Sequence, residues 1–154
     1  MTQQISRHDP RLGAWRAFLR AHARVVGELE RELQAEQDLA LTDYDVLVQL
    51  AGADDRRLRM SELADRLLLS RSGVTRLVDR LVADELVERV TCDSDRRGQW
   101  AALTDAGYQR LRAATPTHLR GVATHFLGRL DSDDLAELER MLDRVLAEET
   151  LRPG

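Results

Sequence analysis

The sequence predicts a mainly α-helical fold with one small β-hairpin, on three observations. Through most of the chain, apolar residues recur every three or four positions, as on one face of a helix. Alternation of polar and apolar residues is confined to 86–92, and 99–104 returns as the paired strand after a charged turn at 93–98. No apolar run is long enough to cross a bilayer. We therefore expect one domain over residues 1–154, with no membrane segment.

The first expected helix covers residues 10–37. Pro10 suits the first turn of a helix, and Asp9 before it is a candidate cap. The apolar residues follow alternating steps of three and four, the spacing of helices that pack along one another: Leu12, Trp15, Leu19, His22, Val26, Leu29 and Leu33. An ordinary core helix would also carry such a stripe. The length of the 10–37 helix, however, favours a helix that joins two copies of the chain.

A lobe of short helices and the hairpin is expected over residues 42–104. Its first helix covers about 42–51, with Thr42 as N-cap and a core face of Tyr44, Leu47, Val48 and Ala51. Leu58 is a candidate edge strand. The next two helices, 61–67 and 71–84, are separated by a tight turn, and Ser70 is the expected N-cap of the second. The spacing of its apolar residues predicts that four of them anchor this helix to the core: Val74, Leu77, Val78 and Leu81.

Two further helices are expected in the C-terminal part, residues 105–150. Thr104 is a candidate cap for the first, and Pro116 should kink that helix or break it in two. The last helix should begin at Asp131 or Ser132, with an apolar face of Leu135, Leu138, Met141 or Leu142, Val145 and Leu146.

The face of helix 71–84 opposite the apolar anchors is polar and basic. Ser70, Ser72 and Thr75 can donate to phosphates or base edges, at a helix N-terminus that already attracts phosphate. Arg71 and Arg76 are long enough to reach guanine, whereas Arg80 is expected to contact phosphate. A solvated polar face would look the same if this helix stood alone. Two short helices joined by a tight turn, however, are typical of DNA-binding proteins.

The hairpin tip carries a second basic group beside this helix. Arg96 and Arg97 are adjacent, with Asp93 and Asp95 close by in sequence. An aspartate that holds an arginine in a fixed pose prepares it for a narrow, negatively charged minor groove. A merely hydrophilic turn is a weaker explanation directly after a helix-turn-helix. The hairpin is therefore interpreted as the wing of a winged helix-turn-helix.

These motifs together resemble the MarR family of bacterial transcriptional regulators. The matching residues are Asp95-x-Arg97 followed after five residues by Leu103-Thr104, the continuation LTDAG, and the segments SELADRL and SRSGVTRLVDRL. The order of helices matches over nearly the whole chain. Two positions depart from the family pattern, because Leu68 and Glu85 stand where glycine is frequent. These departures put the local loop geometry in doubt more than the function.

The resemblance implies a homodimer held by the first and the last two helices. It places two recognition helices in successive major grooves of a pseudo-palindromic double-stranded DNA site, with wings in the flanking minor grooves. On that pattern Arg97 is the wing-tip arginine and Asp95 orients it. Repression is the family's usual mode. Release by a small phenolic or anionic effector is also implied. Trp15 and His22 are candidate contacts for it, although both fit a dimer seam better.

Composition and motifs weigh against other classes. The net charge is −4, but acids gather in residues 131–149, away from the proposed DNA face. The single cysteine, Cys92, rules out an intrachain disulfide, and the N-terminus has no apolar leader, so a cytoplasmic location is expected. Four scattered histidines and no phosphate loop predict no enzyme, no cofactor and no metal site.

Two alternatives stay open. Cys92 could make the protein a redox-responsive regulator, although an ordinary thiol at a strand end explains it more simply. A winged-helix module that binds only proteins is the other, but it would not require basic residues on both the helix and the wing.

Overall fold

The computed structural model describes residues 6–92 and 95–147, with the side chains of 92 and 95–97 left out. Within these residues the fold is mostly helical with a small antiparallel sheet, which confirms the predicted fold class. The helices are α1 Leu12–Gln37, α2 Leu41–Ala51, α3 Met60–Leu67, α4 Arg71–Ala83, α5 Asp105–His125 and α6 Ser132–Leu146. The strands are β1 Arg57–Arg59, β2 Val87–Cys92 and β3 Asp95–Leu103, and the short helical turns are η1 Asp54–Arg56 and η2 Leu127–Arg129.

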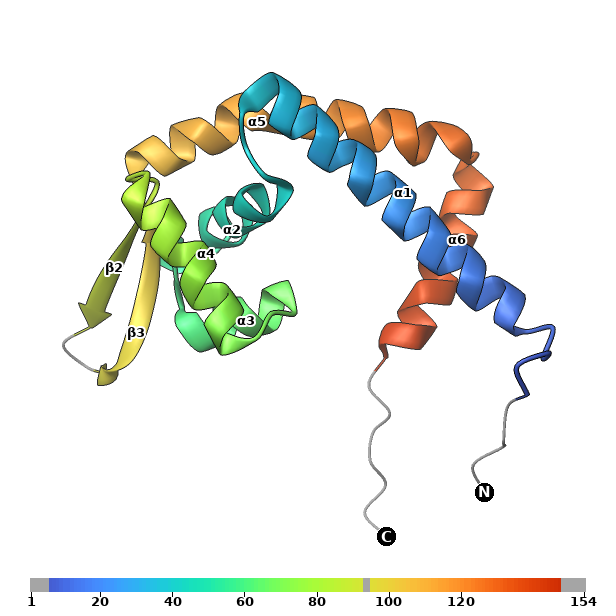
Figure 1. Cartoon of the computed structure of the whole chain (residues 1–154), viewed down its shortest axis with the longest axis horizontal. Helices are drawn as coiled ribbons and strands as arrows, with labels where there is room; N and C mark the ends of the chain where they lie inside the picture. Colours follow the sequence, from blue (N-terminus) through green and yellow to red (C-terminus); the bar gives the residue numbers. More distant parts are fainter. Residues whose placement is uncertain (1–5, 93–94, 148–154) are drawn as a thin grey trace, which may run out of the picture.

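The elements form a lobe and a long helical arm (Figure 1). The lobe contains α2, α3, α4 and the sheet, whose strand order is β1-β3-β2. Leu58 pairs with Ala101 in the edge strand β1, as predicted. Helices α1 and α5 pass over the lobe and extend away from it, and α6 lies at the far end, beside the first half of α1. Helix α4 is therefore well separated from the end of the arm.

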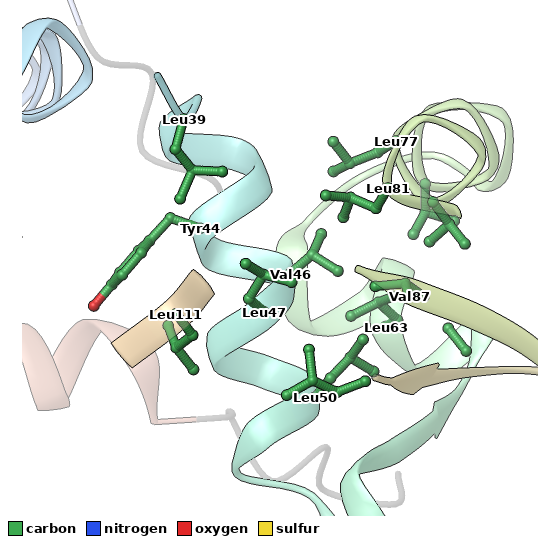
Figure 2. Close-up of a cluster of buried hydrophobic side chains, with 14 of the residues drawn as sticks. Leu39, Tyr44, Val46, Leu47, Leu50, Leu63, Leu77, Leu81, Val87 and Leu111 are labelled. Atoms are coloured by element: carbon green, nitrogen blue, oxygen red, sulfur yellow. The ribbon is translucent and has the colours of Figure 1, made fainter. Parts of the chain in front are cut away.

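The core of the lobe is a leucine and valine cluster centred on α2 (Figure 2). Val46, Leu47 and Leu50 are fully buried there, against residues from α3, α4, β2 and α5. Complete burial of each such side chain contributes roughly 2 kcal/mol. One prediction for α2 was wrong: Val48 is 38% exposed, because the buried face is set by Val46 and Leu50 instead.

The start of α1 differs from the prediction. The helix begins at Leu12, and Pro10 lies in a turn before it. The Asp9 carboxylate accepts the Arg11 backbone N–H at 2.9 Å and also binds the Arg11 guanidinium at 2.6 Å. Asp9 therefore stabilises the preceding turn, and α1 has no side-chain N-cap.

Thr42 is not the N-cap of α2. The helix begins at Leu41 after Ala40, and the Leu41 N–H donates to Glu30 Oε2 on α1 at 2.7 Å. At the other end of the segment that connects α1 to α2, the Arg110 guanidinium of α5 donates to the backbone carbonyls of Gln37 and Asp38. The connection between α1 and α2 is thus held at both ends by side chains from the arm.

Pro116 does not break α5, which runs unbroken from Asp105 to His125. The neighbouring Ala114 and Thr117 are buried, and the Thr115 hydroxyl donates to the Leu111 carbonyl at 2.8 Å. Packing along α1 therefore outweighs the loss of one backbone hydrogen bond at the proline. The predicted cap of α5 is confirmed, because the Thr104 hydroxyl accepts from the Gly107 N–H. The last helix begins at Ser132, one of the two predicted starts, and the Asp131 side chain before it accepts from the Asp134 N–H.

Candidate nucleic-acid interface

The position of α4 is fixed by its cap and its buried face. The Ser70 hydroxyl accepts the Gly73 N–H at 3.1 Å, as predicted. The four expected anchors are all buried, with exposures between 0% and 7%: Val74, Leu77, Val78 and Leu81. The opposite face is exposed and carries every residue proposed from the sequence for this helix: Arg71, Ser72, Thr75, Arg76 and Arg80.

This exposed face carries hydroxyl groups at the start of α4 and long arginine side chains beside them. The Ser70 and Ser72 hydroxyls lie 3.2 Å apart at the start of the helix, and the Thr75 hydroxyl donates to the Arg71 carbonyl at 2.8 Å. Arg71 and Arg76 form no ion pair with any residue that the structure describes. Their guanidinium groups are therefore available to an external acceptor such as a base edge or a phosphate.

Arg80 differs from the other arginines because it has an internal partner. Its guanidinium lies 2.5 Å from Asp43 of α2, a residue only 7% exposed. This hydrogen bond raises the pKa of Arg80, against the opposing effect of burial. The Arg80 side chain is still 53% exposed, so it keeps donors for a second acceptor. Nothing in the sequence connected Asp43 with α4, because the two residues are 37 positions apart.

The hairpin lies beside α4 and is attached to it by Arg89. The Arg89 guanidinium donates to Asp79 of α4 at 2.7 Å and to Gln99 of β3 at 2.9 Å. The strand β3 begins at Asp95, so the turn is shorter than the predicted 93–98. The side chains of Asp95, Arg96, Arg97 and Cys92 lie outside the described residues, and their proposed roles stay predictions.

A polar cleft of about 380 Å³ lies between α4 and the hairpin. Arg59, Ser61, Arg71, Thr75 and Gln99 contribute to its lining. The cleft therefore joins the exposed face of α4 to the stem of the hairpin, and its cationic and hydroxyl groups come from α4, β1 and the start of α3.

A second surface, on the arm, is apolar. Trp15, Phe18 and Leu19 of α1 are 55%, 47% and 44% exposed. Beside them a groove of about 530 Å³ is lined by apolar residues of α1, Phe126 and Leu138 and Leu142 of α6, together with His22. Trp15 stacks on Phe18 at 6.1 Å but does not line the groove. Exposed apolar surfaces of this kind are typical of interaction sites.

The two departures from the family pattern both have left-handed backbone. Leu68, in the turn between α3 and α4, has φ 55° and ψ 38°, and Glu85 after α4 has φ 60°. These are conformations that favour glycine. The turns therefore keep the geometry of a glycine-containing helix-turn-helix without the glycines.

None of the helices in the described part of the chain is long and apolar enough to span a membrane.

Comparison with known proteins places the chain in a family. The MarR family model matches residues 37–98. The crystal structure of AbsC, a MarR family transcriptional regulator from Streptomyces coelicolor, is 34% identical with a TM-score of 0.85, over 93% of this chain and 96% of that one. Sco3205 from the same organism, solved in complex with DNA, is 32% identical with a TM-score of 0.85, over 98% and 96% of the two chains. The transcriptional repressor MprA of Escherichia coli K12 is 29% identical over 78% of this chain and 68% of its own length. Since the fold, the arrangement of helices and the sequence all agree over most of the chain, this protein belongs to the MarR family of transcriptional regulators.

Proposed function

We propose that this protein represses transcription by binding a specific pseudo-palindromic DNA site as a homodimer. The observation that carries the proposal is the exposed hydroxyl and arginine face of α4, held outward by four buried anchors beside the hairpin. Membership in a family of regulators supports it, as does the DNA complex of the similar protein Sco3205.

In this proposal α4 reads the major groove. Ser70, Ser72 and Thr75 bring hydroxyl groups to the phosphates at the N-terminus of the helix. Arg71 and Arg76 reach base edges, where a forked guanidinium recognises guanine. Arg80, steadied by Asp43, contacts a phosphate. Arg96 and Arg97 enter the adjacent minor groove, with Asp95 orienting Arg97.

The dimer is proposed to form through α1, α5 and α6, corresponding to residues 10–37 and 105–150. The exposed apolar stripe and groove on α1 and α6 support this assignment, since a partner would remove them from water. The lobe at 42–104 would then be presented twice. Two recognition helices bind half-sites about 34–36 Å apart, one turn of the duplex.

Repression is the mode we propose because the similar protein MprA is named as a repressor. Release by a small phenolic or anionic effector stays a prediction. His22 lines the apolar groove and Trp15 lies beside it, so both fit a dimer seam better than an effector site.

Fluorescence anisotropy with DNA from upstream of the gene tests the proposal. Arg71→Ala and Arg76→Ala should relax base preference by about 1–3 kcal/mol at single positions, whereas Arg97→Ala should lower affinity strongly and leave the dimer intact. Arg140→Ala is the matched control, since α6 lies away from the lobe (Figure 1) and the Arg140 side chain, 59% exposed and paired with Glu137, is outside the apolar face proposed for the dimer. Equal affinity for the upstream DNA and a shuffled duplex at 150 mM salt would contradict sequence-specific binding and favour a protein-binding module.

A further inference from the structure

Three side chains with metal-binding atoms meet where α1 crosses the end of α5. Glu28 and Glu32 are one helical turn apart on α1, and His125 is the last residue of α5. Their ligand atoms all lie within 4.8 Å of one another, and His125 Nε2 is 2.7 Å from Glu32 Oε1. The Glu32 and His125 side chains are only 18% and 19% exposed, and Glu28 is 37% exposed.

We propose that Glu28, Glu32 and His125 bind a divalent transition-metal ion, with Zn²⁺ as the best fit. One imidazole nitrogen and two carboxylates are ligands that zinc accepts, and three protein ligands leave a fourth position for water. With bonds of about 2.0–2.2 Å, the ligand atoms around a tetrahedral zinc ion are about 3.3–3.6 Å apart. Small rotations of the two glutamate side chains reach this spacing. The site is independent of the proposed DNA contacts.

The packing of α1 on α5 brings these ligands together. A Cβ at position 121 would lie 2.8 Å from Glu32 Oε2 and 2.6 Å from Leu29 Cδ2, so a larger residue there would force both side chains to move. The Glu32 carboxylate therefore lies directly against the α5 backbone, one turn before His125. A groove of about 380 Å³, lined in part by His125, Phe126 and Arg129, gives solvent access to the imidazole.

An internal cation already lies beside the two carboxylates. The Arg31 guanidinium binds Glu28 at 2.7 Å and lies 3.7 Å from Glu32. Its hydrogen bond lowers the pKa of Glu28. Since the Arg31 side chain is 65% exposed, a metal ion can displace it at little cost.

Titration of the full-length, untagged protein with Co²⁺ tests the site. Tetrahedral coordination should give visible absorption bands that saturate at one Co²⁺ per chain and disappear when Zn²⁺ is added. Glu32→Gln and His125→Gln should each weaken binding by about 100-fold, since each removes a ligand. The melting temperature should rise with Zn²⁺ in the unsubstituted protein, because the ion would hold α1 to α5.

Controls separate ligand loss from loss of fold. Glu36→Gln removes a carboxylate of α1 that binds Arg120 instead, and His8→Gln removes an exposed histidine before α1. Both should keep full Co²⁺ binding. The more exposed Glu28→Gln serves if the other ligand variants melt early without metal. Absence of saturable binding at 100 µM Co²⁺, or saturable binding that all three ligand variants retain, would overturn the proposal.

Discussion

Replacing Leu68 with glycine should stabilise the helix-turn-helix. The residue has φ 55° and ψ 38°, and it is 92% exposed, so its side chain contributes almost no burial. A side chain in this left-handed conformation costs about 1–2 kcal/mol relative to glycine. Glycine also gains entropy in the unfolded chain, which removes about 0.4–1 kcal/mol of that benefit. The midpoints of these two ranges leave a net gain of about 0.8 kcal/mol, or about 2–3 °C in melting temperature for a chain of this length.

Thermal unfolding followed by circular dichroism at one fixed protein concentration measures this gain. Leu68→Ala is the matched control, because it removes the exposed side chain but keeps the Cβ that causes the strain. The Leu68→Ala variant should have the same melting temperature as the unsubstituted protein. DNA affinity should be unchanged in both variants. A Leu68→Gly protein that melts at or below the temperature of Leu68→Ala would refute the reasoning.

Three other perturbations address the remaining contacts. Asp43→Ala should lower the free energy of unfolding by about 1–2 kcal/mol in urea and weaken DNA binding, because Arg80 loses its buried partner; unchanged values in both assays would contradict this. Phe18→Asp should give a monomer in analytical ultracentrifugation at micromolar concentration, since it puts a charge on the exposed apolar stripe; an unchanged dimer mass would count against the proposed interface. Burial lowers the pKa of His118 from its ordinary 6.5, so the folded state resists protonation and loses stability as the pH falls below that value. His118→Phe should flatten this loss between pH 7 and 5, and equal slopes would exclude His118 as its source.

The parts of the fold predicted correctly depend on local patterns. The spacing of apolar residues located the helices, and side chains within three residues of a helix start identified the caps at Ser70 and Thr104. The cap at Thr42 was predicted wrongly because Glu30, on another helix, serves the start of α2. A local pattern contains no information about such a contact.

The same limit applies to the candidate sites. The exposed face of α4 followed from helix periodicity, since anchors on one side fix what the other side presents. The Asp43 partner of Arg80 and the Glu28, Glu32 and His125 cluster could not be predicted, because each joins helices that are distant in sequence. Pro116 shows the reverse case, in which a strong local signal for a break yields to packing along α1.

The connection between α1 and α2 has a consequence for which DNA sites can be tolerated. Glu30 holds its far end and Arg110 its near end, so the joint between arm and lobe resists bending. In a dimer that binds two half-sites, a stiff joint fixes the distance between the two lobes. The distance between the half-sites is then fixed as well. One base pair inserted between the half-sites would have to be absorbed by twisting or bending of the DNA. Substitutions at this joint, far from any base, would then widen the set of operators that the protein accepts.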